Sequence, residues 1–133
     1  MSTSLLFVCV HNAGRSQMAA YWFNALAARA KARALSAGTE PGLRVHPVVM
    51  EAMKERGLDL SDAQPQKLTA DLAKGASLLI TMGCGESCPY VPGVPVLDWP
   101  LPDPKGQGIE AVRVIRDEVE SRVRALIDEN GWA

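Results

Sequence analysis

The segment 5–23, LLFVCVHNAGRSQMAAYWF, changes its hydrophobic pattern within one short stretch. Residues 5–9 form a continuous apolar run, which is typical of a buried β-strand. From Met18 onward the apolar residues recur at helical spacing, so a helix is predicted to begin near Gly14. The polar turn CVHNAGRS separates the two patterns, with Cys9 at its start and Arg15 near its end. A strand followed directly by a helix is the repeating unit of α/β folds.

Strands and helices continue to alternate along the rest of the chain. Further strands are predicted at residues 32–39, 77–82 and 94–99. Further helices are predicted at residues 46–57, 64–75 and 109–130. Pro95 lies inside the last strand pattern and cannot donate a ladder hydrogen bond, which favours the sheet edge for that strand. We therefore expect an α/β fold in which residues 1–133 form one three-layer domain, a four-stranded parallel sheet with helices on both faces.

The composition is that of an ordinary globular protein of 133 residues, with 47% hydrophobic and 22% charged residues. The net charge of −1 favours neither a nucleic acid nor a membrane surface as a partner. No apolar run approaches the roughly 20 residues that cross a membrane, and no signal segment is visible, so the expected location is the cytoplasm. In that reducing compartment the three cysteines (Cys9, Cys84 and Cys88) are expected to be free, catalytic or metal-bound.

Cys9 is predicted to lie at the carboxyl end of the first strand, where parallel sheets bind their ligands. The turn after it can wrap backbone N–H groups around an anion, and the following helix adds its positive N-terminal end. Arg15 can hold two oxygens of a tetrahedral oxyanion, and Ser16 can donate a hydrogen bond to the sulfur. This environment favours a Cys9 thiolate aimed at the bound oxyanion. The expected substrate-binding residues are Val10, His11, Asn12, Ala13, Gly14, Arg15 and Ser16.

The motif C-x5-R-S after the first strand, with Asp103-Pro104 far downstream, resembles the low-molecular-weight protein tyrosine phosphatase family. The stretches NAGRSQMA, LSAGTEPG, TMGCGESCP and DWPLPDPKGQG resemble more closely the arsenate reductases of that fold, along most of the chain. Tyrosine phosphatases of this size usually carry an aromatic residue after the Asp-Pro pair, whereas this chain has Lys105-Gly106. The resemblance implies that Asp103 is the general acid of an arsenate reductase.

The resemblance also implies a relay of thiols. Cys9 attacks arsenate and forms a thiol–arsenic adduct, and Cys84 then attacks the Cys9 sulfur, so that two electrons reduce arsenic to arsenite. Cys88 attacks Cys84, and a thioredoxin reduces the resulting redox-active Cys84–Cys88 disulfide. The catalytic residues implied are Cys9, Arg15, Asp103, Cys84 and Cys88. No resident cofactor or metal is expected, and phosphate and sulfate are expected to compete with arsenate.

Two departures from the family pattern concern the electron donor and a cation site. The spacing of Cys84 and Cys88 is C-x3-C, shorter than in thioredoxin-coupled relatives, so a small thiol such as mycothiol is the alternative reductant. Some relatives bind potassium through an asparagine, a serine and an acidic residue. Asn12 and Ser36 match the first two, but Ala20 replaces the third, so a weak or absent potassium site is expected. The alternatives to arsenate reduction are a small phosphatase and a thiol-based arsenite or metal sensor.

Several other polar residues have a structural interpretation. A zinc site at Cys84 and Cys88 is disfavoured, because neither His11 nor His46 stands at ligand spacing. His11 is expected to be a loop residue, and Asp98 a structural residue at a strand end. The charged residues of the last predicted helix are expected to form a solvated face.

Overall fold

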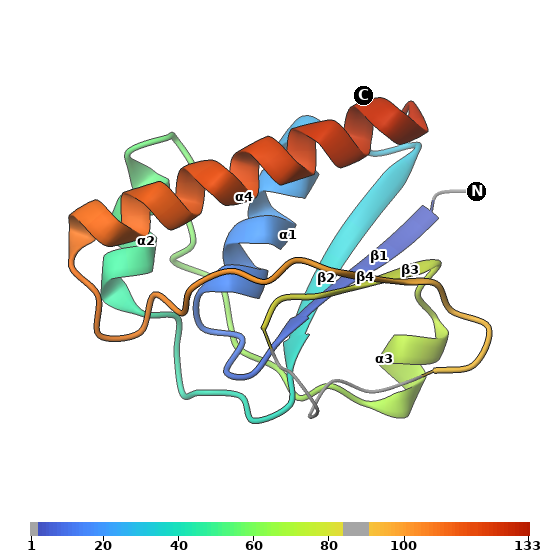
Figure 1. The fold of residues 1–133 in the computed structure, drawn as a ribbon, viewed down its shortest axis with the longest axis horizontal. Coiled ribbons are helices and arrows are strands. Elements are labelled where there is room, and N and C mark those ends of the chain that lie inside the picture. Colours follow the sequence, from blue (N-terminus) through green and yellow to red (C-terminus); the bar gives the residue numbers. More distant parts are fainter. Residues whose placement is uncertain (1–2, 84–90) are drawn as a thin grey trace.

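A computed structural model of the chain describes residues 3–83 and 91–133 and contains the alternating strands and helices that the sequence predicts (Figure 1). The elements are β1 (Thr3–Cys9), α1 (Arg15–Leu26), β2 (Ala32–Gly38), α2 (Pro47–Lys54), α3 (Ala70–Lys74), β3 (Leu78–Thr81), β4 (Val96–Asp98) and α4 (Ile109–Asn130). Each lies within or close to its predicted range. The helix predicted at 64–75 is limited to α3, in the last part of that range.

The four strands form one parallel sheet in the order β2-β1-β3-β4. β1 is an interior strand, paired with β2 along its whole length and with β3 from Leu5 to Val8. β4 is an edge strand, as Pro95 predicts. Cys9 pairs with Gly38 at the end of β2, so it lies at the carboxyl edge of the sheet. This is the edge at which parallel sheets bind ligands.

Helices cover both faces of the sheet (Figure 1). α1, α2 and α4 pack on one face over the main core, to which β1 contributes Leu5, Phe7 and Cys9. α3 lies on the opposite face over a smaller cluster, to which β1 contributes Leu6 and Val8. The alternation follows from strand geometry, because successive side chains point to opposite faces. The predicted α/β class with a four-stranded parallel sheet is therefore confirmed.

Local sequence sets the helix ends. Gly14 is the N-cap of α1, directly after the polar turn. Pro47 occupies the first turn of α2, where a missing backbone N–H is tolerated. Gly131 ends α4 in the left-handed conformation, with a φ of 69°. Within residues 3–83 and 91–133, no helix has both the length and the apolar character of a membrane span.

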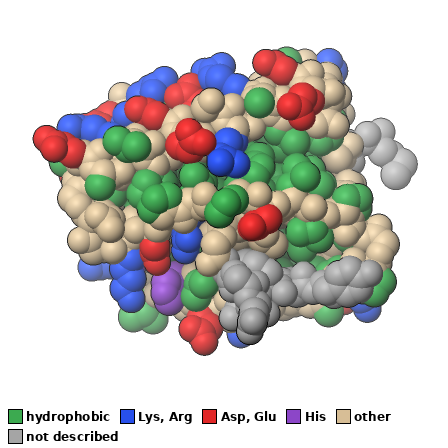
Figure 2. Space-filling model, viewed as in Figure 1, with side chains coloured by type: hydrophobic (Ala, Val, Ile, Leu, Met, Phe, Trp, Pro, Cys, Tyr) green, Lys and Arg blue, Asp and Glu red, His purple; other side chains and the backbone are tan. Residues whose placement is uncertain are grey.

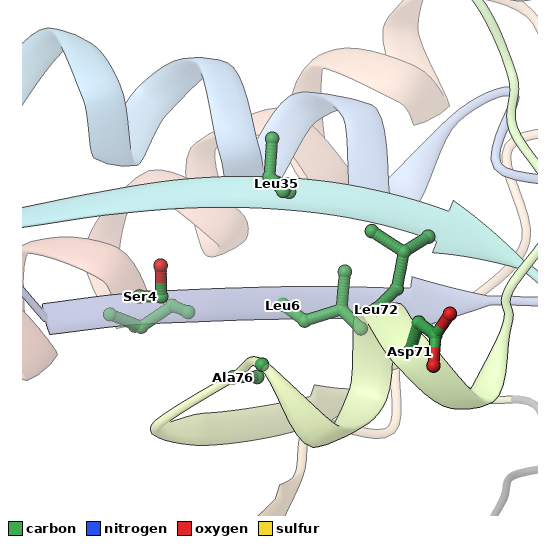
Figure 3. Close-up of a pocket in the computed structure, with 8 residues that line it drawn as sticks. Ser4, Leu6, Leu35, Asp71, Leu72 and Ala76 are labelled. Atoms are coloured by element: carbon green, nitrogen blue, oxygen red, sulfur yellow. The ribbon is translucent and has the colours of Figure 1, made fainter.

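A small pocket opens between α3 and the sheet, on the face that carries the smaller cluster (Figure 3). Leu6, Leu35 and Leu72 are among the residues that line it, and Asp71 is at its border. The lining side chains include no thiol, imidazole or guanidinium. The pocket therefore reflects the packing of the short helix α3, and the predicted chemistry belongs to the carboxyl edge of the sheet.

The charged face of α4 is not simply solvated, which corrects the expectation from the sequence. Figure 2 shows acidic and basic side chains close together along this helix. Arg116 is only 6% exposed and donates hydrogen bonds to the Ala52 carbonyl and to Glu55, near the end of α2. A hydrogen bond from Arg113, with help from Arg116, lowers the pKa of Glu55 to about 2. The cause is the docking of α2 beside α4, which brings acceptors of one helix to the arginines of the other.

Candidate active site

The turn between β1 and α1 is held from outside by the segment that follows β2. Backbone N–H groups from residues 40–46 donate hydrogen bonds of 2.8–3.0 Å to the carbonyl oxygens of Val10, His11 and Ala13. In a trans peptide unit the C=O group and the next N–H group point in opposite directions. The N–H groups of His11, Asn12 and Gly14 therefore point to the inner side of the turn, where an anion can accept from them. Residues 10–16 are termed the oxyanion loop below.

The sulfur of Cys9 is surrounded by donors from the oxyanion loop. The residue is 2% exposed. The Asn12 N–H donates to Cys9 Sγ at 3.3 Å, and Ser16 Oγ lies 2.9 Å from the same sulfur. α1 begins at Arg15, so the positive end of its helix dipole adjoins the sulfur. The sulfur thus faces a backbone N–H, a hydroxyl group and the N-terminal end of α1.

Asn12 determines the direction of the hydrogen bond between Ser16 and Cys9. The Gln66 N–H donates to Asn12 Oδ1 at 2.9 Å, which identifies this atom as the amide oxygen. Asn12 Nδ2 then donates to Ser16 Oγ at 2.7 Å, so the Ser16 hydroxyl proton is free to point to the Cys9 sulfur. Asn12 has a φ of 50°, in the left-handed region that asparagine tolerates better than most residues. The oxyanion loop therefore presents a hydroxyl donor to the sulfur.

The Arg15 guanidinium lies between the segment that carries Asp103 and the end of β3. Arg15 is 6% exposed, and its Nη1 donates to the Leu101 carbonyl at 3.1 Å. Its Nη2 lies 3.7 Å from Asp103 Oδ2. Gly83 packs against the same guanidinium so closely that a Cβ there would collide with Nη1. Gly83 also has a φ of 88°, so its contact and its backbone conformation both favour glycine.

Asp103 reaches the oxyanion loop because the next residue packs on it. Pro104 is buried, and a Cβ added at Gly14 would lie 2.5 Å from the proline ring. The Lys105 N–H donates to Asp103 Oδ1 at 3.0 Å, and the Asp103 side chain is 44% exposed. The structure thus brings together Asp103, Arg15 and the loop that holds Cys9, although Asp103 is far from the others in sequence. A solvent-accessible carboxyl group in this place can exchange protons with both water and a bound ligand.

This combination of fold and site occurs in known proteins. A family model described as low molecular weight phosphotyrosine protein phosphatase matches residues 4–130. The chain belongs to this family. Among its curated relatives, a Halobacterium salinarum protein named, provisionally, as an arsenate reductase is 42% identical over 136 residues. That match covers 96% of this chain and 93% of the relative.

Solved structures that resemble this chain also include arsenate reductases. A thioredoxin-dependent arsenate reductase of Corynebacterium glutamicum is 40% identical, with a TM-score of 0.83. The match covers 96% of this chain but 61% of the other, so this chain spans less than two thirds of that protein. An arsenate reductase in a phosphate-binding state is 33% identical, with a TM-score of 0.83 and coverage of 96% and 98%. A protein tyrosine phosphatase of the family also shares the fold. The resemblance to arsenate reductases of this fold is confirmed.

His46 is a neighbour of the oxyanion loop that the sequence did not reveal. The His46-Pro47 pair indicated only the start of a helix, and His46 is indeed the N-cap of α2. Burial lowers the pKa of the His46 imidazole, the Asp103 carboxylate opposes this shift, and His11 and Lys105 add to it. His46 is therefore a mainly neutral imidazole at neutral pH, and a Cβ added at Gly14 would lie 3.7 Å from its Cδ2 atom. Its proximity depends on the fold of the 39–46 segment, for which the sequence carries no signal.

His11 and Asp98 have structural partners, as the sequence indicated. His11 Nδ1 lies 3.2 Å from the Glu40 carbonyl oxygen. The Thr81 hydroxyl donates to Asp98 Oδ1 at 2.8 Å, which links the ends of β3 and β4. Neither interaction involves the Cys9 sulfur.

Cys84 and Cys88, the second and third thiols of the predicted relay, lie outside the described residues. β3 ends at Thr81, and the Met82 N–H donates to the Val8 carbonyl of β1 at 2.8 Å. The chain therefore reaches Gly83 beside the oxyanion loop. The relay itself stays a prediction.

The predicted absence of zinc and the predicted weak potassium site also stay predictions. In the part of the chain that the structure describes, no three His, Cys, Asp or Glu side chains gather as metal ligands. Asn12 Oδ1, one candidate potassium ligand, accepts hydrogen bonds from the Gln66 N–H and from Gln17 Nε2. Ala20, at the position of the missing acidic ligand, is buried.

Proposed function

We propose that this chain reduces arsenate to arsenite, with Cys9 as the nucleophile of the oxyanion loop. The observation that carries the proposal is the convergence of the Cys9 sulfur, the Arg15 guanidinium and the Asp103 carboxyl on one loop. Relatives named as arsenate reductases support the choice of substrate. The relative in a phosphate-binding state supports a tetrahedral oxyanion as the ligand and phosphate as a competitor.

In the first step, the N–H groups of the oxyanion loop and Arg15 hold the oxyanion while the Cys9 thiolate attacks arsenic. An S–As bond forms and an As–O bond breaks. Asp103 donates its proton to the departing hydroxide, which leaves as water. General acid catalysis of this kind typically contributes about 10²- to 10⁴-fold. Because the Asp103 side chain is 44% exposed, solvent can return the proton after each turnover.

The second step takes two electrons from thiols. Cys84 attacks the Cys9 sulfur, a Cys9–Cys84 disulfide forms, and the S–As bond breaks with its electron pair left on arsenic, which departs as arsenite. Cys88 then attacks Cys84, which releases the Cys9 thiolate and leaves a Cys84–Cys88 disulfide for thioredoxin. Support for this relay comes from the family resemblance, from the thioredoxin-dependent relative and from the position of Gly83, which follows β3 and lies beside Arg15 of the oxyanion loop.

A small thiol such as mycothiol is the competing electron donor. It would attack the adduct from solution, and Cys84 and Cys88 would remain reduced. Both routes need a reducing compartment, which fits the cytoplasm as the proposed location.

The test of the relay gives pre-reduced enzyme arsenate but no reductant, and maps the cysteines by peptide mass spectrometry. The relay predicts a single turnover to arsenite and a Cys84–Cys88 disulfide. Cys88→Ser should stop with Cys9 bonded to Cys84, because the last exchange has lost its attacking thiol. In a parallel reaction with an added small thiol, Cys84 and Cys88 that stay reduced while Cys9 is linked to that thiol would replace the thioredoxin route with the mycothiol route.

Phosphatase activity is the second candidate function, because a protein tyrosine phosphatase shares the fold. It would use Cys9, Arg15 and Asp103, but water would complete the cycle and the cysteine pair would not be needed. Phosphate release from p-nitrophenyl phosphate and arsenite formation should therefore be measured on the same preparation, with Cys84→Ala as the separating variant. The reductase proposal expects this substitution to abolish arsenite formation in the absence of an external thiol. Sustained phosphate release without arsenite formation would overturn the proposal.

A further inference from the structure

Gln17 lies in the first turn of α1 and is 3% exposed, although its side chain is polar. Its Nε2 atom donates to the Asn12 carbonyl at 3.1 Å, to Asn12 Oδ1 at 3.1 Å and to the Gln64 carbonyl at 3.2 Å. Two of these three atoms are backbone carbonyl oxygens, which can only accept, so the side-chain atom that meets them must be the amide nitrogen. A buried NH₂ group thus lies where three oxygen atoms converge.

These three oxygens belong to two segments that are far apart in sequence. Asn12 is in the oxyanion loop, whereas Gln64 is in the connection between α2 and α3. The Gln66 N–H from the same connection donates to Asn12 Oδ1 as well. Asn12 is therefore held between α1 and the 64–66 segment by donors on two sides. Leaving the two Asn12 oxygens short of donors would be costly, because Asn12 is fully buried and a buried polar group needs a partner.

The conformation of Asn12 matters directly for the sulfur of Cys9. Asn12 has a φ of 50°, and this left-handed conformation costs energy that its surroundings have to offset. The same residue directs its N–H to Cys9 Sγ and its Nδ2 to Ser16 Oγ. A change in Asn12 would therefore disturb both donors to the sulfur and the inward N–H groups on each side of Asn12.

We infer that Gln17 is a positioning residue for the oxyanion loop, whose amide NH₂ group holds Asn12 in its left-handed conformation. Gln17 does not donate to the Cys9 sulfur in the structure, and it acts through Asn12. The inference rests on the oxyanion loop of the proposed function, but it does not depend on the thiol relay. It is therefore tested by phosphate binding to the reduced full-length chain, without turnover.

The primary variants are Gln17→Ala, which removes the donor and leaves a gap, and Gln17→Met, which keeps the length of the side chain but has no donor. Both should raise the dissociation constant of inorganic phosphate about tenfold, the effect of leaving a buried hydrogen-bonding group without its partner. Isothermal titration calorimetry measures the dissociation constant, and thermal unfolding reports stability on the same samples.

Asn24→Ala is the matched control. Asn24 also lies on α1 and also makes side-chain amide bonds across to another element, since Nδ2 donates to the Ala34 carbonyl at 2.9 Å and Oδ1 accepts from the Ala34 N–H at 2.8 Å. It contacts β2 and makes no bond to the oxyanion loop. Asn24→Ala should lower the unfolding temperature and leave phosphate binding unchanged.

Ammonium supplies the readout that a purely structural role would not move. Ammonium ions carry N–H donors and are small enough to enter the gap left by Gln17→Ala, where the Asn12 and Gln64 carbonyl oxygens have lost this donor and Asn12 Oδ1 keeps only the Gln66 N–H. Ammonium chloride should therefore restore phosphate binding to Gln17→Ala, relative to choline chloride at the same ionic strength. It should not do so in Gln17→Met, because the thioether side chain fills the space.

The inference is overturned if both Gln17 variants bind phosphate as tightly as the wild type, or if Asn24→Ala weakens binding equally. It is also overturned if ammonium has no effect on Gln17→Ala or acts equally on Gln17→Met. A wild-type chain that does not bind phosphate would instead contradict the oxyanion site of the proposed function, so the two failures can be told apart.

Discussion

Replacing Gly83 with alanine should weaken oxyanion binding and, through a separate cost, the stability of the fold. The added Cβ would collide with Arg15 Nη1, so the guanidinium has to move. The end of an arginine side chain can move at modest cost, but here the movement removes its hydrogen bond to the Leu101 carbonyl and its alignment with a bound oxyanion. Gly83 has no side-chain chemistry of its own, so a loss of oxyanion binding on its substitution reports on the geometry of Arg15.

The magnitude follows from two separate costs. Hydrogen bonds to charged groups contribute about 1.5–3 kcal/mol, so the loss of one bond from Arg15 should raise the phosphate dissociation constant about 10- to 150-fold. The positive φ of Gly83 adds a folding cost of about 1–2 kcal/mol for a residue with a Cβ. For a domain of this size, that cost corresponds to a decrease in unfolding temperature of roughly 4–8 °C.

Gly57→Ala is the control that separates these two costs. Gly57 has a φ of 78°, but apart from Gly57 and its two chain neighbours no described atom lies within 4 Å of the position that its Cβ would occupy. Both variants should therefore lose similar thermal stability, and only Gly83→Ala should lose phosphate affinity. Calorimetric titration of the reduced proteins with phosphate measures the affinity. Equal phosphate affinity in the two variants would refute the assignment of Gly83 as the residue that makes room for Arg15.

Three further predictions test the chemistry and the helix packing. Cys9→Ser should abolish arsenite formation and leave thermal unfolding unchanged, because a neutral hydroxyl cannot replace a thiolate; clear residual activity would contradict this. Asp103→Asn should slow single-turnover arsenite formation by about 10²- to 10⁴-fold and preserve phosphate binding, and an unchanged rate would indicate another proton donor. Hydrogen bonding to Arg113 and Arg116 lowers the pKa of Glu55 from 4.5 to about 2, so its contribution to stability is present above pH 4.5 and is lost as pH falls toward 2. Urea unfolding measures the free energy of unfolding, and the difference in this free energy between wild type and Glu55→Gln should narrow as the pH falls from 4.5 to about 2. A difference that stays constant with pH would refute this contribution of Glu55.

Strand and helix order could be predicted from the sequence because each element has a local hydrophobic period. The continuous apolar run at 5–9 became the interior strand β1, and Pro95 correctly indicated an edge strand. The helix predicted at residues 109–130 became α4, which ends at Asn130 as predicted. These features depend on neighbours within a few positions, so no knowledge of the tertiary structure is needed.

The oxyanion loop could be anticipated for the same reason. Cys9 and Arg15 are joined by one turn, and the geometry of a strand-turn-helix unit carries the sulfur and the guanidinium to the same edge. Asp103 was different, because only the family resemblance connected it to Cys9. Its placement depends on Pro104 packing against Gly14, a contact between segments whose sequence separation is large.

The charged residues of α4 show why the remaining contacts could not be predicted. The helical period correctly separated an apolar stripe from a polar face, but it did not show that α2 would dock against part of that polar face and bury Arg116.

The sequence by itself determined the order of the elements, the edge at which Cys9 emerges and the turn that carries Arg15, because these follow from local backbone geometry. Only the tertiary structure decided that Gly83 makes room for Arg15, that His46 lies beside Gly14 and that Gln17 contacts both Asn12 and the 64–66 segment. The physical reason is that a hydrogen bond or a close contact between distant segments depends on how whole layers pack. That packing is selected by the burial of many apolar side chains together, and no single stretch of the chain records it.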